Sequence, residues 1–223
     1  MPNYIFGIAA LLASLPASAG PMGFQDSWML MGDFSPNWRE ASINYAVTPR
    51  DAFGASATYM RSDDESKTRD LAELTYTRLV KRWNMRDAQA NIWFSGGIGT
   101  ISGKRIEHHP AMNGADIDGG QTMVTPGLQF DYETSRVYFS VAEKLYRAKD
   151  LNHDFSSVRA GFSFYETHYN QTQPWFILEA RRMNGLTDKT EITPMLRLIN
   201  PNYFIEAGIN NSSQLRFNFM YVF

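Results

Sequence analysis

Apolar and polar residues alternate along most of the chain, beginning near residue 25. In the last ten residues the apolar side chains occupy every second position: Leu215, Phe217, Phe219, Tyr221 and Phe223. Successive side chains of a β-strand point to opposite faces, so this segment predicts a strand with one strongly aromatic face and one largely polar face. A helix would spread the same five residues around its axis, which excludes a helical interpretation.

The same alternation predicts about twelve strands, separated by turns rich in Pro, Asn, Asp and Gly. The predicted ranges are 25–33, 38–47, 52–61, 68–82, 88–101, 120–132, 136–147, 155–166, 173–182, 190–199, 203–210 and 214–223. Well over half of the chain after residue 19 then lies in strands. An ordinary soluble domain has about 20–25% strand, so the fraction indicates a barrel.

Residues 4–15 form an apolar stretch that is too short for a membrane-spanning helix, which needs about 20 residues. Pro16 follows, and Ala17-Ser18-Ala19 has the small-x-small form that signal peptidase accepts. No Lys or Arg precedes the apolar stretch, and the alternative is a buried N-terminal helix. We expect a signal peptide over 1–19, cleaved after Ala19, and one domain over 20–223.

Composition narrows the class of protein. The chain has 223 residues, a formal net charge of −2, 14% aromatic residues and no cysteine. The length suits one domain, and the charge excludes a strongly basic nucleic-acid binder. The absence of cysteine excludes disulfides and thiolate catalysis.

Two classes of all-β protein fit the alternation: a soluble sandwich and a transmembrane barrel. The polar faces mix Ser, Thr, Asn and Gln with charges of both signs, as crowded barrel lumens do. Tyr45, Tyr59 and Tyr221 stand near strand ends, where aromatic girdles meet the membrane interface. Most short turns fall on one side of an up-and-down arrangement, and the longest loop, 102–119, falls on the other. These features favour a single transmembrane, antiparallel, up-and-down β-barrel of about twelve strands.

The chain resembles small bacterial outer-membrane β-barrel proteins. The resemblance is carried by the N-terminal segment, the alternation over 25–223 and the aromatic terminal strand. It implies contact with outer-membrane lipid, extracellular long loops and periplasmic termini. Phe219, Tyr221 and Phe223 resemble the C-terminal signal that the barrel-assembly machinery reads. No subfamily of known activity is identified, so no functional residue is transferred.

Charged residues on the polar faces of neighbouring C-terminal strands form a candidate lumen cluster: Arg159, Glu179, Arg181, Arg197, Glu206 and Arg216. One interpretation is a charged constriction that favours anions. The other is mutual neutralisation, in which Arg–Glu pairs stiffen a filled interior.

Two further chemistries have candidate residues. Glu107, His108, His109 and Met112 offer ligands for a copper-like or zinc-like ion, the alternative being a solvated loop. A lipid hydrolase needs a serine within reach of a base, and Ser102 or Ser156 with His108 or His153 are candidates. No motif joins these residues, so no catalytic residue is assigned and no cofactor is expected.

The sequence therefore predicts a structural or narrow-channel barrel for small solutes or ions. The alternatives are a metal-linked barrel and, less favoured, a lipid-active enzyme. Three positions depart from the pattern. Pro126 and Pro194 interrupt strands and predict a bulge or a shortened strand. Glu143 has lipid-facing parity, so either its strand bulges or it extends beyond the membrane there.

Overall fold

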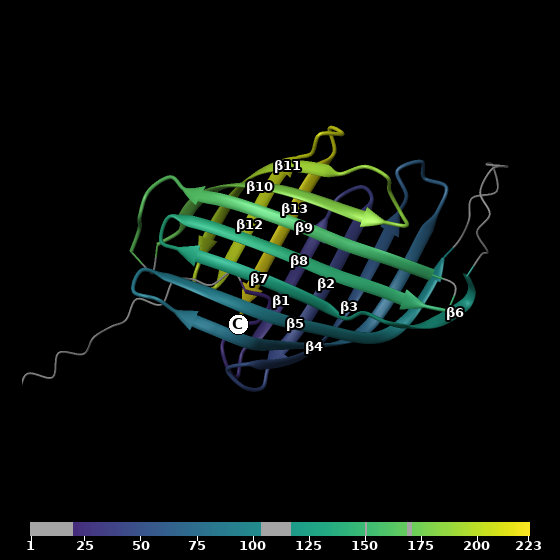
Figure 1. Ribbon diagram of the computed structural model, residues 1–223, viewed down its shortest axis with the longest axis horizontal. Coiled ribbons are helices and arrows are strands. Elements are labelled where there is room, and N and C mark those ends of the chain that lie inside the picture. Colours follow the sequence, from purple (N-terminus) through teal and green to yellow (C-terminus); the bar gives the residue numbers. More distant parts are fainter. Residues whose placement is uncertain (1–19, 104–116, 150, 169–170) are drawn as a thin grey trace, which may run out of the picture.

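The computed structural model describes residues 20–103, 117–149, 151–168 and 171–223. These residues form antiparallel strands that close into a barrel (Figure 1). The strands are β1 Trp28–Phe34, β2 Trp38–Ala46, β3 Asp51–Arg61, β4 Thr68–Asn84, β5 Ala88–Gly103, β6 Ile117–Val124, β7 Gly127–Thr134, β8 Val137–Ala148, β9 Leu151–Ser163, β10 Gln173–Asn184, β11 Glu191–Asn200, β12 Tyr203–Ile209 and β13 Leu215–Val222. Among the described residues, no helix is long and apolar enough to cross a membrane.

Closure comes from pairing of the first and last strands, from Met29 opposite Val222 to Phe34 opposite Phe217. Every other strand pairs with its neighbours in the chain, and β6 and β7 together occupy one position between β5 and β8. The wall thus has twelve positions. The predicted all-β, twelve-stranded up-and-down barrel is confirmed, and closure leaves no edge strand to aggregate.

Pro126 divides the predicted strand 120–132 into β6 and β7, but it does not shift the register. Val124 pairs with Ile98 and Gly127 pairs with Ser95, three residues apart on both strands. Of the two alternatives predicted there, the bulge is therefore wrong and the shortened strand is confirmed, because β6 ends at Val124. The amide of Thr125 still donates to Gly97 O at 2.9 Å, and Pro126 O accepts from the amide of Leu145 at 2.9 Å. Only the donor that proline lacks is missing from the ladder.

The other two positions that depart from the alternating pattern are Pro194 and Glu143. At Pro194, β11 stays in register with β10, while its ladder with β12 begins one residue later, at Met195 opposite Gly208. Glu143 keeps its outward parity in an unbroken register with β9, so the bulge alternative is wrong for that position too. A bulge does occur where the sequence predicts none, between Leu79 and Lys81 in β4.

The predicted loop 148–154 is wrong, because β9 starts at Leu151, which pairs with Ala148. The sequence Asn152-His153-Asp154 reads as a polar loop, yet His153 points inward and is buried. Tertiary packing at the barrel mouth, rather than local propensity, makes this segment a strand.

The distribution of side chains is inverted relative to a soluble protein. Outward-facing apolar side chains are exposed on every side of the barrel, with Leu74 at 68%, Leu196 at 60% and Leu215 at 64%. Inward-facing residues include buried charged groups such as Arg181 and Glu206. This arrangement is that of an outer-membrane-type β-barrel, in which hydrocarbon rather than a second sheet covers the apolar face.

Candidate functional site: the lumen

The lumen has two ends, which we call the terminal end and the loop end. The terminal end carries the start of β1, the end of β13 and the turns 47–50, 85–87 and 201–202. The loop end carries the turns 35–37, 62–67 and 185–190 and the connection between β5 and β6.

An ion-pair belt follows the wall formed by β9 to β13 and β1. It contains four arginines and four carboxylates: Arg159, Arg181, Arg197, Arg216, Asp33, Glu179, Glu191 and Glu206. The belt therefore carries no net formal charge.

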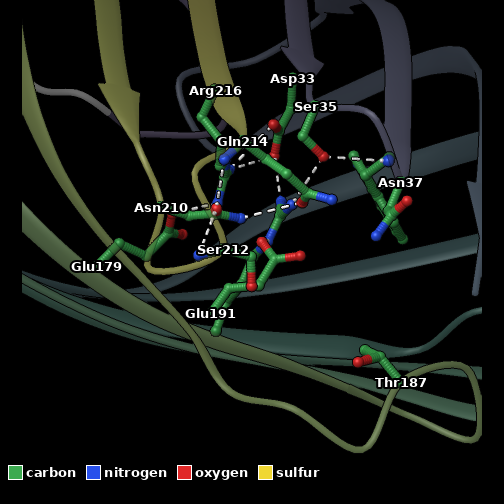
Figure 2. A network of polar contacts seen from close by, with 12 residues as sticks. Asp33, Ser35, Asn37, Glu179, Thr187, Glu191, Asn210, Ser212, Gln214 and Arg216 are labelled. Atoms are coloured by element: carbon green, nitrogen blue, oxygen red, sulfur yellow. Dashed lines mark hydrogen bonds and ion pairs between the residues drawn. The ribbon is translucent and has the colours of Figure 1, made fainter. Parts of the chain in front are cut away.

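Asp33 of β1 ties the belt across the barrel seam (Figure 2). Its carboxylate accepts from Arg216 Nη2 at 2.8 Å and from Arg181 Nη1 at 3.3 Å. Arg216 Nη1 also lies 2.6 Å from Glu179 Oε2, and Arg181 Nε lies 2.8 Å from Glu191 Oε2. Each guanidinium thus spans two carboxylates, which its planar fork of donors suits well.

Glu206 is the centre of the second half of the belt. It is fully buried, accepts from Arg197 Nε at 2.6 Å and from Asn218 Nδ2 at 2.9 Å, and also pairs with Arg159. The Arg197 guanidinium lies over the ring of Tyr138, 4.6 Å from its centroid. The six residues that the sequence predicts as a lumen cluster are brought together here. Asp33 and Glu191 complete the belt, and only the register of β1 and β11 reveals their part in it.

Apolar side chains line the lumen at the loop end, where a water-filled channel would have polar ones. This loop-end cluster consists of Trp38, Met60, Leu71, Ile101, Met123, Tyr146, Leu151, Met183 and Leu186. Smaller apolar clusters lie toward the terminal end, one around Trp175 and Ile177 and one around Met29 and Met220. The belt therefore lies between apolar layers.

Polar contacts between turns cover the loop-end cluster. Asp63 of the turn 62–67 accepts from Asn37 Nδ2 at 3.0 Å and from the Thr187 hydroxyl. Three turns that are far apart in sequence are joined in this way. Asp64 organises the same turn by accepting from the Ser62 and Ser66 hydroxyls, and these hydrogen bonds lower its pKa to about 2.

A cavity of about 250 Å³ lies in the lumen between β1–β5 and β6–β9. We call it the chamber. Its wall includes the acidic residues Asp33, Glu40 and Glu73, the base Lys144, and the aromatic residues Trp38, Trp93, Tyr146 and Phe155.

Glu143 also lines the chamber but has outward parity, and two of the three inward-facing carboxylates are fully engaged. Asp33 belongs to the belt, and Glu73 accepts from Lys144 Nζ at 2.6 Å, from Ser56 Oγ at 3.0 Å and from Thr125 Oγ1. Glu40 differs. Within the described part of the chain, no basic side chain lies within ion-pair distance of its carboxylate. The chamber therefore has one carboxylate in excess.

The other candidate residues do not assemble into a site. Glu107, His108, His109 and Met112 lie outside the described residues. Those residues contain no group of three His, Asp or Glu side chains placed to hold a metal ion. Ser156 and His153 lie three positions apart on β9, so their side chains leave opposite faces of the wall. The structure does not join them as nucleophile and base.

Comparisons with known proteins give matches among solved structures only. No protein-family model and no curated protein matches the sequence. Among solved structures, the chain is similar to the KdgM porin, with 12% identity, a TM-score of 0.46 and coverage of 87% of this chain and 98% of that one. It is also similar to a loop-deletion mutant of OmpT, an outer membrane protein of Vibrio cholerae (9%, 0.35, 89% and 98%). A third is CdiB from Acinetobacter baumannii (9%, 0.34, 90% and 60%). These likenesses concern the fold alone.

Proposed function

We propose that this protein is a narrow channel of the bacterial outer membrane for small solutes or ions, closed at its loop end in the described conformation. The observation that carries the proposal is the chamber: charged, polar and aromatic groups line a cavity inside a barrel whose exterior is apolar. A barrel with a purely structural role has no need of an internal cavity, since side chains alone fill a small lumen.

The termini are assigned to the periplasm and the loop end to the cell exterior. Short turns are typical of the periplasmic side of such barrels, and the longest connection, between β5 and β6, belongs to the loop end. The aromatic residues Phe219, Tyr221 and Phe223 lie at the end of β13 and are assigned to recognition by the assembly machinery. Outer-membrane lipid covers the exposed apolar belt.

The loop-end cluster acts as the gate. Apolar constrictions exclude water and hydrated ions by dewetting, without physical blockage by a separate domain. Leu71 and Met183 belong to strands on different sides of this cluster, and the contacts of Asp63 hold the turns above it. Movement of the turns would therefore open the lumen.

The belt does not favour an anion-selective constriction. Its arginines are each paired with carboxylates, and its formal charge is zero. The second interpretation of the charged residues, mutual neutralisation that stiffens one wall, fits these contacts better.

Single-channel recording in planar bilayers tests the proposal. We expect brief, rare openings of the wild-type protein and a several-fold higher open probability for Leu71→Ser, because a hydroxyl wets the gate. Leu74→Ser is the matched control, since Leu74 lies on the same strand but faces outward. Silence of both wild type and Leu71→Ser at all voltages would contradict the channel function.

A metal-linked function remains a second candidate because of one observation. Three buried methionines, Met60, Met123 and Met183, come together in the loop-end cluster from β3, β6 and β10. Thioethers are soft ligands that select ions such as Cu(I). Titration with Ag(I), a stable soft probe, should give weaker binding to the triple Met→Leu variant than to wild type. Equal binding of Ag(I) by the two proteins would remove this candidate. In the same assay, the His108→Ala/His109→Ala variant tests whether these two histidines bind the ion.

A further inference from the structure

The chain preceding β1 folds back into the lumen. Ser27 donates through its amide to Phe24 O at 3.1 Å, and Asp26 has a left-handed backbone with φ of 62°. This turn reverses the chain at the terminal end. Gly23 then lies against Met29 and Val222, both of which face inward: a Cβ on Gly23 would be 3.3 Å from Val222 Cγ1. Residues before the turn are therefore inside the barrel.

Pro21 reaches the chamber. It contributes to the same wall as Met31, Glu40 and Asn44, and Gly20 before it is buried. The register of β1 and β2 sets the scale: Met29 is opposite Asn44, and Asp33 is opposite Glu40. A strand rises about 3.3 Å per residue, so Glu40 lies roughly 13 Å further along the wall than Met29. Residues 20–23 contain bends at Pro21 and Met22. Three residues span at most about 10 Å, so Gly20 lies in the stretch of the lumen between Met29 and Glu40.

The start of the cleaved chain and the chamber carry groups of opposite charge. Cleavage after Ala19, as the sequence predicts, would leave Gly20 with a free α-amino group, which is largely protonated near neutral pH. The chamber has one excess carboxylate, Glu40, whose charged neighbours are Lys144, Asp33 and Glu73. An uncompensated carboxylate away from bulk water is costly, and an added cation removes that cost.

We propose that the α-ammonium group of Gly20 docks in the chamber beside Glu40, so that residues 20–23 occupy part of the chamber from the terminal end. The proposal concerns the occupant of the chamber and does not depend on conduction through the barrel. Export and processing then complete the interior, because only a cleaved chain has a cation at this position.

The ionisation of the α-amino group tests the proposal directly. The exported protein is purified in detergent, and its intact mass is expected to show Gly20 as the first residue. Its amines are labelled in urea by reductive methylation with ¹³C-formaldehyde, which keeps their charge, and the protein is refolded. We expect the Gly20 signal to titrate at least one pH unit above the ordinary α-amino range of about 7.7–8.0, a tenfold or greater gain in proton affinity.

Two variants assign the effect to Glu40. Glu40→Gln, which keeps the shape of the side chain, should return the titration to the ordinary range. Glu65→Gln, which removes an exposed carboxylate in the turn 62–67, should leave it raised. A Ser-Gly extension before Gly20 moves the ammonium group away and should also abolish the shift. An ordinary titration in wild type, no response to Glu40→Gln, or a mature chain that starts elsewhere would each overturn the proposal.

Discussion

At the scale of single residues, charged side chains are buried in the lumen because each is paired with a group of opposite charge. Glu206 is 0% exposed and pairs with two arginines, and Arg181 and Arg216 are each 1% exposed. Burial of such groups is tolerated only with partners of opposite charge, so each member of the belt depends on the others. The belt stiffens one wall, and it leaves the chamber on the other side of the lumen.

Removal of one carboxylate from the belt should be strongly destabilising. Glu206→Gln leaves Arg159 and Arg197 with one partner fewer in a buried setting, so we expect a loss of about 3–5 kcal/mol in the free energy of unfolding. Urea unfolding of the protein folded into lipid vesicles measures it. Glu65→Gln is the control, because Glu65 is 63% exposed and its pair with Arg61 is worth at most about 1 kcal/mol. Similar losses for both variants would show that the belt is not the stabilising element.

Glu73 provides a second test at this scale. A Cβ on Gly97 would lie 2.2 Å from Glu73 Oε2 and 2.5 Å from Thr125 Oγ1, so only glycine leaves room for the Glu73 contacts. Gly97→Ala should therefore destabilise the barrel by roughly 1–3 kcal/mol, the usual cost of overpacking a core. Gly96→Ala, on the neighbouring outward position, meets only the ring of Phe94 at 3.2 Å and should cost less in the same unfolding assay. A larger loss for Gly96→Ala would contradict the assignment of faces on β5.

At the scale of the strand, the bulge in β4 decides which residues reach the lumen. Leu79 faces inward, and Val80 is the extra residue. After it, Arg82 turns inward, where its Nε donates to Asn91 Oδ1 at 2.7 Å, while Lys81 lies over the outward ring of Trp83. The side-chain period of a strand is two, and the bulge absorbs the extra residue, so the inward-facing positions are odd-numbered before it and even-numbered after it.

Deletion of Val80 should leave those faces unchanged. Lys81 would then follow Leu79 directly, so it would keep its outward position opposite Ile92, and Arg82 would stay inward opposite Asn91. We therefore expect a barrel that folds and unfolds like wild type to within about 1 kcal/mol, as does Val80→Ala, since Val80 is exposed. Heat-modifiable mobility in gels and urea unfolding report both results. A deletion variant clearly less stable than wild type would mean that the bulge itself stabilises the barrel.

The outward faces of two strands test contact with hydrocarbon. Leu196 lies near the middle of β11, and Leu215 lies at the loop end of β13. Arginine on the lipid face costs about 2–4 kcal/mol at the bilayer midplane and about 0–1 near the interface. Leu196→Arg should therefore destabilise the protein in vesicles far more than Leu215→Arg. Equal effects of the two substitutions would contradict a membrane around this exterior.

At the scale of the whole molecule, closure gives every strand two neighbours and leaves the apolar exterior without a protein partner. Detergent or lipid must cover that exterior for the barrel to stay dispersed. We expect the mature chain to be folded and monomeric in detergent micelles and to aggregate when the detergent is removed, as followed by light scattering and circular dichroism. A monomeric, folded protein in plain buffer would refute the membrane assignment.

The alternation along the chain is enough to predict most of the strands, the twelve positions of the wall and most of the faces. Alternation at period two is a local property, and it correctly separates Phe217 and Leu196 outside from Arg216 and Arg197 inside. It also identified the six charged residues of the lumen, because parity alone assigns them to one side of the wall.

The roles of those residues follow from contacts between distant strands. The pairing of Asp33 with Arg181 and Arg216 joins residues about 150 and 180 positions apart, and it depends on closure of β1 against β13. The same holds for the unpaired carboxylate of Glu40, the loop-end cluster and the return of residues 20–23 into the lumen. Contacts across a barrel depend on register and closure, and a single strand pattern carries no information on either.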